Sequence, residues 1–433
     1  MKYLSTKGEA PATTLSQAIS LGLASDGGLF VPESFPTFTK ADFARVESLA
    51  EVAQILLAPF FADDPLATRL PLICQDAFNF PVPLRPIASK DGLSVLELFH
   101  GPTAAFKDIG ARFLAAALQH IETDHNSSEL KVLVATSGDT GGAVAAAFHD
   151  RPGISVYVLY PAGMVSPRQE KQLTCWGDNV HALRVAGVFD DCQSLVKQAF
   201  ASDALRADLR LTSANSISIA RLLPQTVYYA AASLWHWREY GTAASFIVPT
   251  GNLGNAVAGI WARHMGLPIG KIVLATNANR SIPDYLEKGQ WEPRQSLATL
   301  ASAMDVGNPS NMERLRHLYA DFDELNSRID AYAVSDQQIT RQIVHDYQSH
   351  QQLWCPHTAT AAFVFDNYLE QKKTEPGHIV VATAHPAKFE TVIEPMIDDV
   401  IEVPPALGKL LSLPGSYRDM TTDFVQFEQV LRS

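Results

Sequence analysis

The sequence has few cysteines, and their positions argue against a zinc site. Only four of the 433 residues are cysteine. None of them has the CxxC or Cys/His spacing that a zinc ion requires. Scattered single cysteines are typical of a reducing compartment. We therefore expect no metal ligands, and we interpret the following four residues as packing residues: Cys74, Cys175, Cys192 and Cys355.

Basic clusters and long apolar runs are also missing. The chain carries 34 Lys and Arg against 46 Asp and Glu, for a formal net charge of -12. Without a block of basic residues to neutralise phosphates, nucleic-acid binding is disfavoured. No apolar run reaches 18 residues, and the N-terminal stretch "MKYLSTKGEAPATT" has no apolar core like that of a signal peptide. These features predict a cytoplasmic globular protein that does not enter a membrane.

What the sequence does have is a repeated pattern of a short apolar run, a turn of small residues and a helical stretch. The pattern occurs in "LKVLVATSGDTGGAVAAAFH", "ASFIVPTGNLGNAVAGIWARHMG" and "GHIVVATAHPAKFE". Further strand candidates are "ISVYVLYPAG" and "KIVLATNA". Unbroken apolar runs predict strands that are buried on both faces. We therefore expect the α/β class, with mainly parallel sheets covered by helices.

The first 80 or so residues differ, because they combine helical stretches with proline-rich joins. The second join, "FPVPLRPI", suggests a domain boundary. We predict a small N-terminal domain over residues 1–82, followed by two α/β lobes over residues 83–235 and 236–433. A cleft between two such lobes is a common place for a ligand.

Lys107 stands in an unusual place, between "HGPTAAF" and an amphipathic helical stretch. A cation disfavours the positive end of a helix dipole. One interpretation is that Lys107 is a surface charge near a helix start. The other is that it is kept from water, so that a neutral amine is available to form a Schiff base.

Two turns could bind anions through backbone N–H groups at a helix start. The first contains Gly251, Asn252, Leu253, Gly254 and Asn255, and it suits a phosphate. The alternative for this turn is a purely structural strand-to-helix turn. The second turn could bind the carboxylate of a ligand, and its candidate residues are Thr136, Ser137, Asp139 and Thr140. The alternative interpretation of this turn is an ordinary helix cap.

Two further segments contain candidate binding residues. Arg221 follows Asn215 and Ser216 among apolar residues, where a guanidinium suits recognition of phosphate or carboxylate. The alternative is a surface arginine on an amphipathic helix. Thr383 ends an apolar strand, where parallel sheets bind ligands. The nearby His385 and Lys388 are assigned no role.

The lysine segment, the S-G-D-T-G turn and the G-N-L-G-N turn, in that order, resemble the fold-type II pyridoxal-phosphate enzymes. The segments "LGLASDGGLFVPESFP", "SANSISIARLLPQ" and "SAMDVGNPSNMERL" are similar to those of the threonine synthase family, in its longer bacterial and fungal branch. The resemblance spans nearly the whole chain. It implies a fold like the tryptophan synthase β subunit, a small N-terminal domain and pyridoxal 5'-phosphate as cofactor.

The resemblance also implies roles for individual residues. Lys107 would carry the cofactor and act as the catalytic base, the turn at residues 251–255 would hold its phosphate, and Thr383 would face its pyridine nitrogen. Many relatives have Asn where this chain has Asp139, beside the cofactor's 3'-oxygen. A carboxylate there would need a proton or a rotated pose. The remaining candidates would bind substrate: Thr136, Ser137, Thr140, Asn215, Ser216 and Arg221.

The implied substrate is O-phospho-L-homoserine, and no protein partner is implied. Two rivals stay open on the sequence. One is another fold-type II lyase, such as a serine or threonine dehydratase, which needs no second phosphate site. The other is a non-catalytic relative that binds a phosphorylated metabolite, since a fold does not determine a function.

Overall fold

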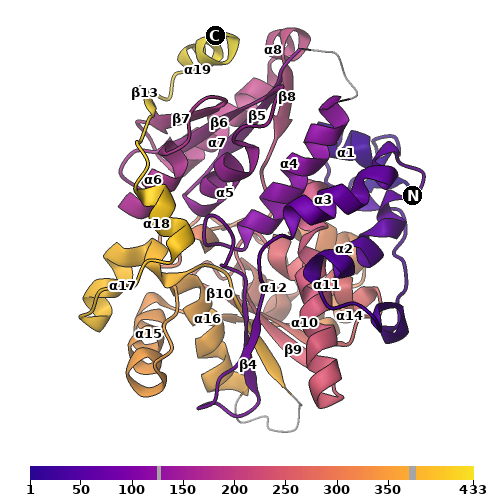
Figure 1. The fold of residues 1–433 in the computed structure, drawn as a ribbon, viewed down its shortest axis with the longest axis vertical. Coiled ribbons are helices and arrows are strands. Elements are labelled where there is room, and N and C mark those ends of the chain that lie inside the picture. Colours follow the sequence, from indigo (N-terminus) through magenta and orange to yellow (C-terminus); the bar gives the residue numbers. More distant parts are fainter. Residues whose placement is uncertain (124–127, 370–376) are drawn as a thin grey trace.

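Two mainly parallel β-sheets and a small N-terminal unit make up the protein in this computed structural model, which describes residues 1–123, 128–369 and 377–433 (Figure 1). In Figure 1 the smaller sheet lies above the larger one, and the N-terminal helices lie along one side of both. The expected α/β class with parallel sheets is confirmed.

The smaller sheet has five parallel strands. In spatial order they are β13 (Arg418–Met420), β7 (Val180–Val185), β6 (Ile154–Pro161), β5 (Leu130–Ala135) and β8 (Arg210–Ser213). Apolar side chains on both faces are buried, so helices cover both. One face packs against α4 (Lys107–Thr123), α5 (Asp139–Phe148) and α6 (Pro167–Thr174), and the other against α7 (Phe189–Ala201), α8 (Asp203–Asp208) and α19 (Phe424–Arg432).

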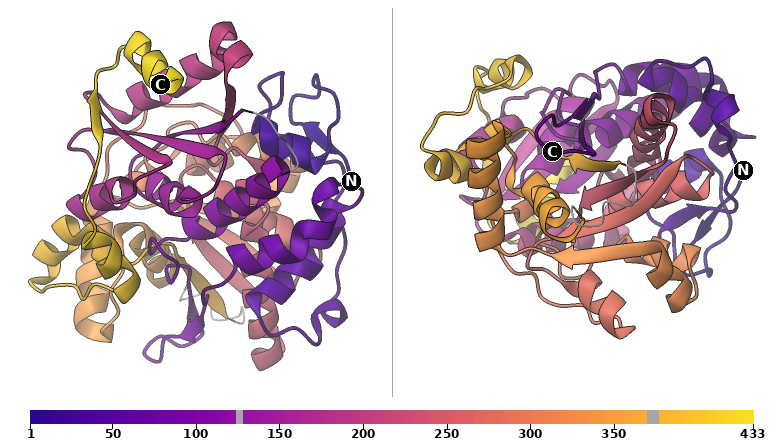
Figure 2. Two further views of the ribbon diagram at one scale, coloured as in Figure 1. Left: turned by 45° about the horizontal axis from the view of Figure 1, so that its top comes forward. Right: turned by 90° about the horizontal axis from the view of Figure 1, so that it is seen from below.

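The larger sheet has six strands, and the last of them is antiparallel. In spatial order they are β11 (Ile329–Ala333), β10 (Ile269–Thr276), β9 (Ala244–Pro249), β12 (His378–Ala382), β4 (Leu93–Glu97) and β3 (Leu84–Pro86). Figure 2 shows this sheet from below, with helices on both sides.

Alternate strand residues of the larger sheet belong to two separate apolar cores. The core between the two sheets includes α9 (Ile219–Leu222), α10 (Gln225–Tyr240), α11 (Gly254–His264), α12 (Ser281–Lys288), α13 (Met312–Leu318) and α14 (Phe322–Arg328). The outer core includes α15 (Asp336–His350), α16 (Pro356–Val364), α17 (Glu390–Ile397) and α18 (Pro405–Leu411).

The N-terminal unit pairs β1 (Tyr3–Ser5) with β2 (Phe30–Pro32) in an antiparallel ladder. Its helices are α1 (Leu15–Leu21), α2 (Leu49–Leu57) and α3 (Leu70–Ala77). Their apolar side chains join the same core as α4 and α10. The unit therefore packs against both sheets' helices without adding a strand to either sheet.

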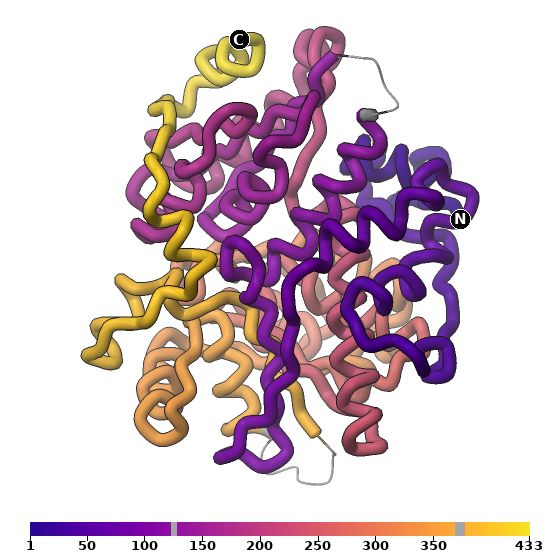
Figure 3. Tube along the Cα trace, viewed as in Figure 1, coloured from indigo at the N-terminus to yellow at the C-terminus, as the bar shows by residue number. Residues whose placement is uncertain are grey.

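The two sheets do not follow the expected division of the chain at residue 235. Strands β3 and β4 come directly after the N-terminal unit, yet they belong to the larger sheet. Strand β13, close to the C-terminus, belongs to the smaller one. Figure 3 shows the chain descending to the larger sheet before α4 returns it upward. A boundary at 235 therefore does not separate the sheets, because strand pairing joins segments far apart in sequence.

The structure also bears on the cysteines and on membrane-spanning helices. All four cysteines are buried as free thiols, which confirms them as packing residues. Within the described part of the chain, no helix is long and apolar enough to cross a membrane.

Candidate active site

A cavity of about 2140 Å³ contains every candidate site residue named from the sequence. It lies at the carboxyl ends of strands from both sheets, since Ala135, Pro161, Pro249 and Thr383 all line it. This is the edge at which parallel α/β sheets bind ligands. The predicted residues along its walls are Lys107, Thr136, Ser137, Asp139, Thr140, Asn215, Ser216, Arg221, Gly251, Asn252, Leu253, Gly254, Asn255 and Thr383.

Lys107 is the first residue of α4, and its side chain lines the cavity. Burial lowers the pKa of its amine to about 8. The charge of Asp139 opposes this shift, and the charge of Arg221 adds to it. Asp108 supplies the negative charge that the helix start favours, and it accepts hydrogen bonds from the backbone and hydroxyl of Thr103. The interpretation of Lys107 as an ordinary surface charge is therefore wrong.

The loop before Lys107 is tied to the end of β12. Phe106 N–H donates to the carbonyl of Thr383 at 2.8 Å, and His385 N–H donates to the carbonyl of Ala104 at 3.0 Å. Ala104 itself has a positive φ of 55°, a backbone conformation that residues other than glycine rarely adopt. Held by these bonds, Lys107 and Thr383 face the same cavity from segments 276 positions apart.

The turn before α11 depends on Gly251 more than on Gly254. A Cβ atom at Gly251 would lie 2.6 Å from Met304 Cα, whereas one at Gly254 would meet nothing closer than Asn311 Nδ2 at 3.5 Å. The left-handed residue is Leu253, with φ of 63°. Protein atoms alone thus require glycine only at the first position. At the second position, glycine leaves the space beside the helix start open, as the predicted phosphate would require.

Asn255, in the first turn of α11, has a free donor. Its Oδ1 accepts hydrogen bonds from the hydroxyls of Tyr228 and Tyr229, the latter at 2.8 Å. Because Oδ1 is the atom that accepts these two bonds, Nδ2 is the remaining polar atom of the amide. This buried Nδ2 has no hydrogen-bond partner among the described residues. An unpaired buried donor at a helix start suits an anion, and so this turn fits a phosphate group.

In the turn before α5, two backbone donors are already in use within the turn. The Thr136 hydroxyl accepts hydrogen bonds from the N–H groups of Gly138 at 3.0 Å and Gly141 at 2.8 Å. Ser137 and Thr140 line the cavity beside it. Thr136 therefore stabilises the turn itself, and its role in substrate binding stays a prediction.

Asp139 is paired with a lysine to which sequence reasoning assigned no role. Its Oδ1 lies 2.9 Å from Nζ of Lys388 and accepts a hydrogen bond from Gln169 at 3.1 Å. The charges of Lys388 and Lys107 outweigh burial and hold the pKa of Asp139 well below its usual range. Lys388 therefore neutralises the ionised carboxylate of Asp139. A lysine within the apolar run "AHPAKF" was the available signal, because a buried charge requires a partner.

Arg221 is 2% exposed, so the surface alternative for it is wrong. One guanidinium nitrogen donates to the carbonyl of Ala214, and the buried Nε has no partner among the described residues. Burial lowers the pKa of Arg221 to about 10, against the charge of Asp108. Gly110 of α4 allows this close approach, since a Cβ there would lie 3.0 Å from Nε.

A hydrogen-bond network links Ser216 to the phosphate-binding turn. Asn252 Nδ2 donates to the Ser216 hydroxyl at 2.7 Å, and Asn311 Nδ2 donates to the Asn252 carbonyl at 2.9 Å. The fully buried Arg314 holds this network in place. It donates to Asn311 Oδ1 at 2.6 Å and to the carbonyl of Phe30 in β2 at 2.9 Å. Arg314 belongs to the segment "SAMDVGNPSNMERL", but no role was predicted for it from the sequence.

His357 lines the cavity and was missed by sequence reasoning. It lies at the start of α16, where its Nε2 accepts a hydrogen bond from Ala303 N–H at 3.1 Å. Its buried Nδ1 has no partner in the described ranges. Burial lowers the pKa of His357 to about 4, so the ring is neutral near pH 7. No spacing in the sequence pointed to it.

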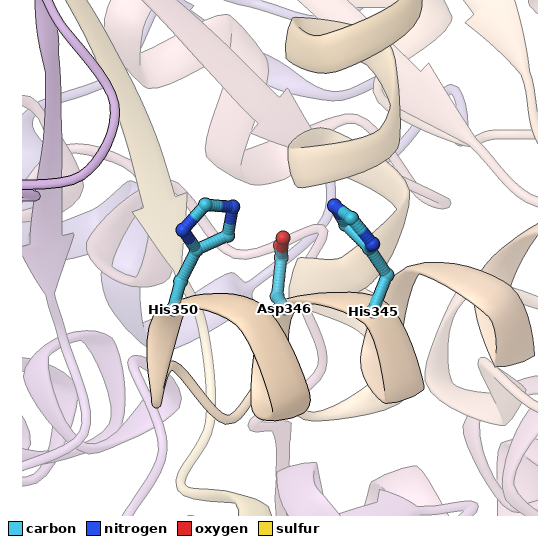
Figure 4. A group of neighbouring side chains, drawn as sticks. All are labelled: His345, Asp346 and His350. Atoms are coloured by element: carbon cyan, nitrogen blue, oxygen red, sulfur yellow. The ribbon is translucent and has the colours of Figure 1, made fainter.

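A separate group of ligand-type side chains lies on α15, outside the cavity. Figure 4 shows His345, Asp346 and His350 projecting from the same side of that helix. Asp346 accepts hydrogen bonds from Lys90 at 2.8 Å and from the indole of Trp354 at 2.6 Å. Because its carboxylate already neutralises a buried lysine, this group is best explained as a structural ion pair with two neighbouring histidines.

Comparisons with known proteins agree with this geometry. Residues 80–384 match the family described as pyridoxal-phosphate dependent enzyme, residues 2–78 match the threonine synthase N terminus, and residues 358–431 match the threonine synthase C-terminal family. The threonine synthases of Haemophilus influenzae and Escherichia coli are 39% and 36% identical to this chain, over 100% of it and 99% of each relative.

Solved structures give the same result. A structure described as PLP-bound threonine synthase from Brucella melitensis matches with a TM-score of 0.92 at 35% identity, and the E. coli threonine synthase matches with 0.90 at 34%. Each comparison covers 100% of this chain and 99% of the other. Maize serine racemase, at 16% identity and a TM-score of 0.54, shares the fold alone. This chain belongs to the threonine synthase family of pyridoxal-phosphate-dependent enzymes.

Proposed function

We propose that this enzyme converts O-phospho-L-homoserine and water into L-threonine and phosphate. The observation that supports the proposal most directly is Arg221, a buried guanidinium that forms no ion pair with a carboxylate in the described part of the chain. It lines the same cavity as Lys107 and the turn at residues 251–255. A buried cation of this kind suits an anion on the substrate. The cavity thus offers one anion site for a cofactor and a second one for a substrate.

The residues present fit pyridoxal phosphate. Lys107 offers an amine of lowered pKa for covalent attachment, and the start of α11 with the free Nδ2 of Asn255 offers a site for its phosphate. Thr383 is predicted to face the ring nitrogen, and the ion-paired Asp139 to lie near the 3'-oxygen. When bound, the cofactor supplies an electron sink for carbanion chemistry.

The reaction moves protons and breaks one carbon–oxygen bond. Protons leave the α- and β-carbons, phosphate leaves the γ-carbon, and the γ-carbon becomes a methyl group by gaining a proton. Water supplies the hydroxyl that joins the β-carbon, its other proton balances the released phosphate, and the α-carbon regains a proton. We assign these proton transfers to Nζ of Lys107, since the pKa of its amine is lowered to about 8, close to the working pH.

Holding the leaving phosphate is the task of a second group of residues. Arg221 supplies a charge and Ser216 a hydroxyl, which the amide of Asn252 and the network around Arg314 hold in place. Fixed donors stabilise charge where it develops and need no reorganisation during the reaction. Thr136, Ser137, Thr140 and Asn215 line the cavity as well, and substrate binding stays their predicted role.

The experiment is to incubate the purified enzyme with O-phospho-L-homoserine and to measure phosphate and threonine together. We expect both in equal amounts, and neither from the Lys107→Ala variant. L-Serine and L-threonine serve as comparison substrates, with formation of 2-oxo acids as the readout. Faster 2-oxo acid formation would favour the dehydratase alternative, and no turnover of any of the three would favour the non-catalytic one.

A further inference from the structure

The ammonium of Lys388 has two fixed acceptors inside the protein. The residue belongs to the short 3-10 helix η6 (Pro386–Phe389), and its side chain is fully buried. Its Nζ lies 2.9 Å from Asp139 Oδ1 and donates to the carbonyl of Thr103 at 2.7 Å. The ion pair thus connects the end of the larger sheet to the start of α5.

Helix α6 holds both partners of this ion pair in place. Gln169 donates to Asp139 Oδ1 at 3.1 Å, and Gln172 donates to the Thr103 carbonyl at 3.0 Å. From the same helix cap, the Ser166 hydroxyl donates to the backbone carbonyl of Lys388 at 2.9 Å. Because Asp139 lines the cavity, these bonds fix the ion pair at the edge of the site.

Lys107 lies close to this pair but forms no ion pair with any described residue. The charged or titratable groups that act on its amine are Asp139 from α5, Arg221 from α9, Lys388 from η6 and His357 from α16. Asp139 is the one anion among these four. His357 stays neutral, since burial lowers its pKa to about 4.

We propose that Lys388 is a positioning residue that holds the Asp139 carboxylate as its own partner and so keeps that carboxylate from pairing with the nitrogen of Lys107. Without Lys388, a buried carboxylate beside Lys107 would attract the proton on Nζ and retain it. With Lys388, the pair is neutral overall, and Nζ of Lys107 can release its proton. The inference rests on the proposed covalent attachment of the cofactor to Lys107, not on the identity of the substrate.

The test follows the absorbance of the lysine-bound cofactor in the full-length holoenzyme between about pH 5 and about pH 10. The midpoint reports protonation of Lys107 Nζ, and no substrate is present. Lys388→Met leaves the carboxylate unpaired, so the midpoint should rise by about one unit or more. Asp139→Asn leaves the ammonium unpaired, so the midpoint should fall by about one unit or more. The double variant should return to within about half a unit of the parent.

A matched control distinguishes this role from mere packing. Lys90→Met breaks another buried ion pair, that between Lys90 and Asp346, and neither of these residues lines the cavity. It should lower stability and leave the midpoint unchanged. The proposal is overturned if Lys388→Met and Asp139→Asn move the midpoint in the same direction, or if either leaves it unmoved.

A second readout needs no cofactor at all. Acetylation of Lys107 in the cofactor-free full chain, followed by mass spectrometry over the same pH range, reports the same protonation. It should give the same two opposite shifts. If Lys388→Met does not fold, Asp139→Asn decides alone, and a midpoint that rises or stays constant rejects the proposal. Because neither readout involves O-phospho-L-homoserine, failure here and failure of the proposed activity are told apart.

Discussion

The turns that begin α5 and α11 look alike in sequence, as small and polar residues between a buried strand and a helix, but they use their donors differently. In the turn before α11, the buried Nδ2 of Asn255 has no partner among the described residues. In the turn before α5, the Thr136 hydroxyl accepts hydrogen bonds from the N–H groups of Gly138 and Gly141, and Lys388 neutralises Asp139. The first turn keeps a buried side-chain donor for a ligand anion, whereas the second uses two of its backbone donors within the turn and has its carboxylate paired with a lysine.

This difference teaches that a glycine-rich turn at a helix start is not by itself a binding site. What decides is whether the surrounding protein leaves donors unpaired. At the second turn, the positive charge available to a ligand comes from elsewhere, namely from Arg221 on α9. Substitutions in the two turns and at Arg221 test this division.

Gly251→Val should abolish retention of the cofactor. A Cβ at this position would lie 2.6 Å from Met304 Cα, so the turn before α11 has to move away from its ligand-binding position. The measurement is cofactor content after dialysis, with circular dichroism to check folding. Gly177→Val is the matched control, because a Cβ at Gly177 meets no atom within 4 Å and Gly177 does not line the cavity. If Gly251→Val retained cofactor no worse than Gly177→Val, the close approach at Gly251 would have no function.

Arg221→Ala should leave the absorbance of the bound cofactor unchanged, because the cofactor's phosphate is predicted to lie in the other turn. Activity toward O-phospho-L-homoserine should fall by roughly 30- to 1000-fold in kcat/KM, or about 2–4 kcal/mol of transition-state stabilisation. Arg221→Lys should recover only part of this loss, since a point charge lacks the bidentate fork. Activity within about threefold of the parent would remove Arg221 from the substrate site.

Exchanging the acidic and amide side chains of the two turns should have unequal effects on cofactor binding. Asn255→Asp replaces the free Nδ2 donor by a carboxylate oxygen, which repels a phosphate, and should weaken cofactor binding by roughly 10- to 100-fold. Asp139→Asn should change cofactor affinity much less. Equilibrium titration of the cofactor-free enzyme measures both. Equal losses in the two variants would mean that the turns do not differ in the way described.

Thr136→Val should mainly affect stability. The variant removes the oxygen that accepts two backbone N–H groups in the turn before α5. Buried donors left without a partner cost about 1–3 kcal/mol of unfolding free energy. Denaturant unfolding of the cofactor-free chain is the measurement, with Thr136→Ser as the control that keeps the hydroxyl. A large loss of substrate affinity without loss of stability would return Thr136 to its predicted binding role.

Local patterns in the sequence were sufficient for much of the fold. The apolar runs of β5, β6, β9, β10 and β12 were all predicted as buried parallel strands, because their periodicity is a local property. The membership of β3, β4 and β13 in particular sheets was not predicted, since it depends on strand pairing between distant segments. The division of the chain at residue 235 failed to separate the sheets for the same reason.

Prediction of single site residues from the sequence has the same limit. Every candidate residue lines the cavity, because turns and strand ends mark such positions in the sequence. Lys388, Arg314 and His357 were missed. The partners of Lys388 and Arg314 include Asp139 and Phe30, which lie 249 and 284 positions away along the chain. Sequence spacing carries no information about such pairs when a single chain is considered.

The position of β12 has a consequence for how the chain is made. This strand lies between β9 and β4, although it is the last strand of the larger sheet to be synthesised. Until residue 382 has left the ribosome, both neighbours present unpaired edges, which favour association with other chains. Contacts of such high sequence separation also form slowly. The nascent enzyme should therefore depend on chaperones until β12 has been released and has paired, and it should take up its cofactor only afterwards.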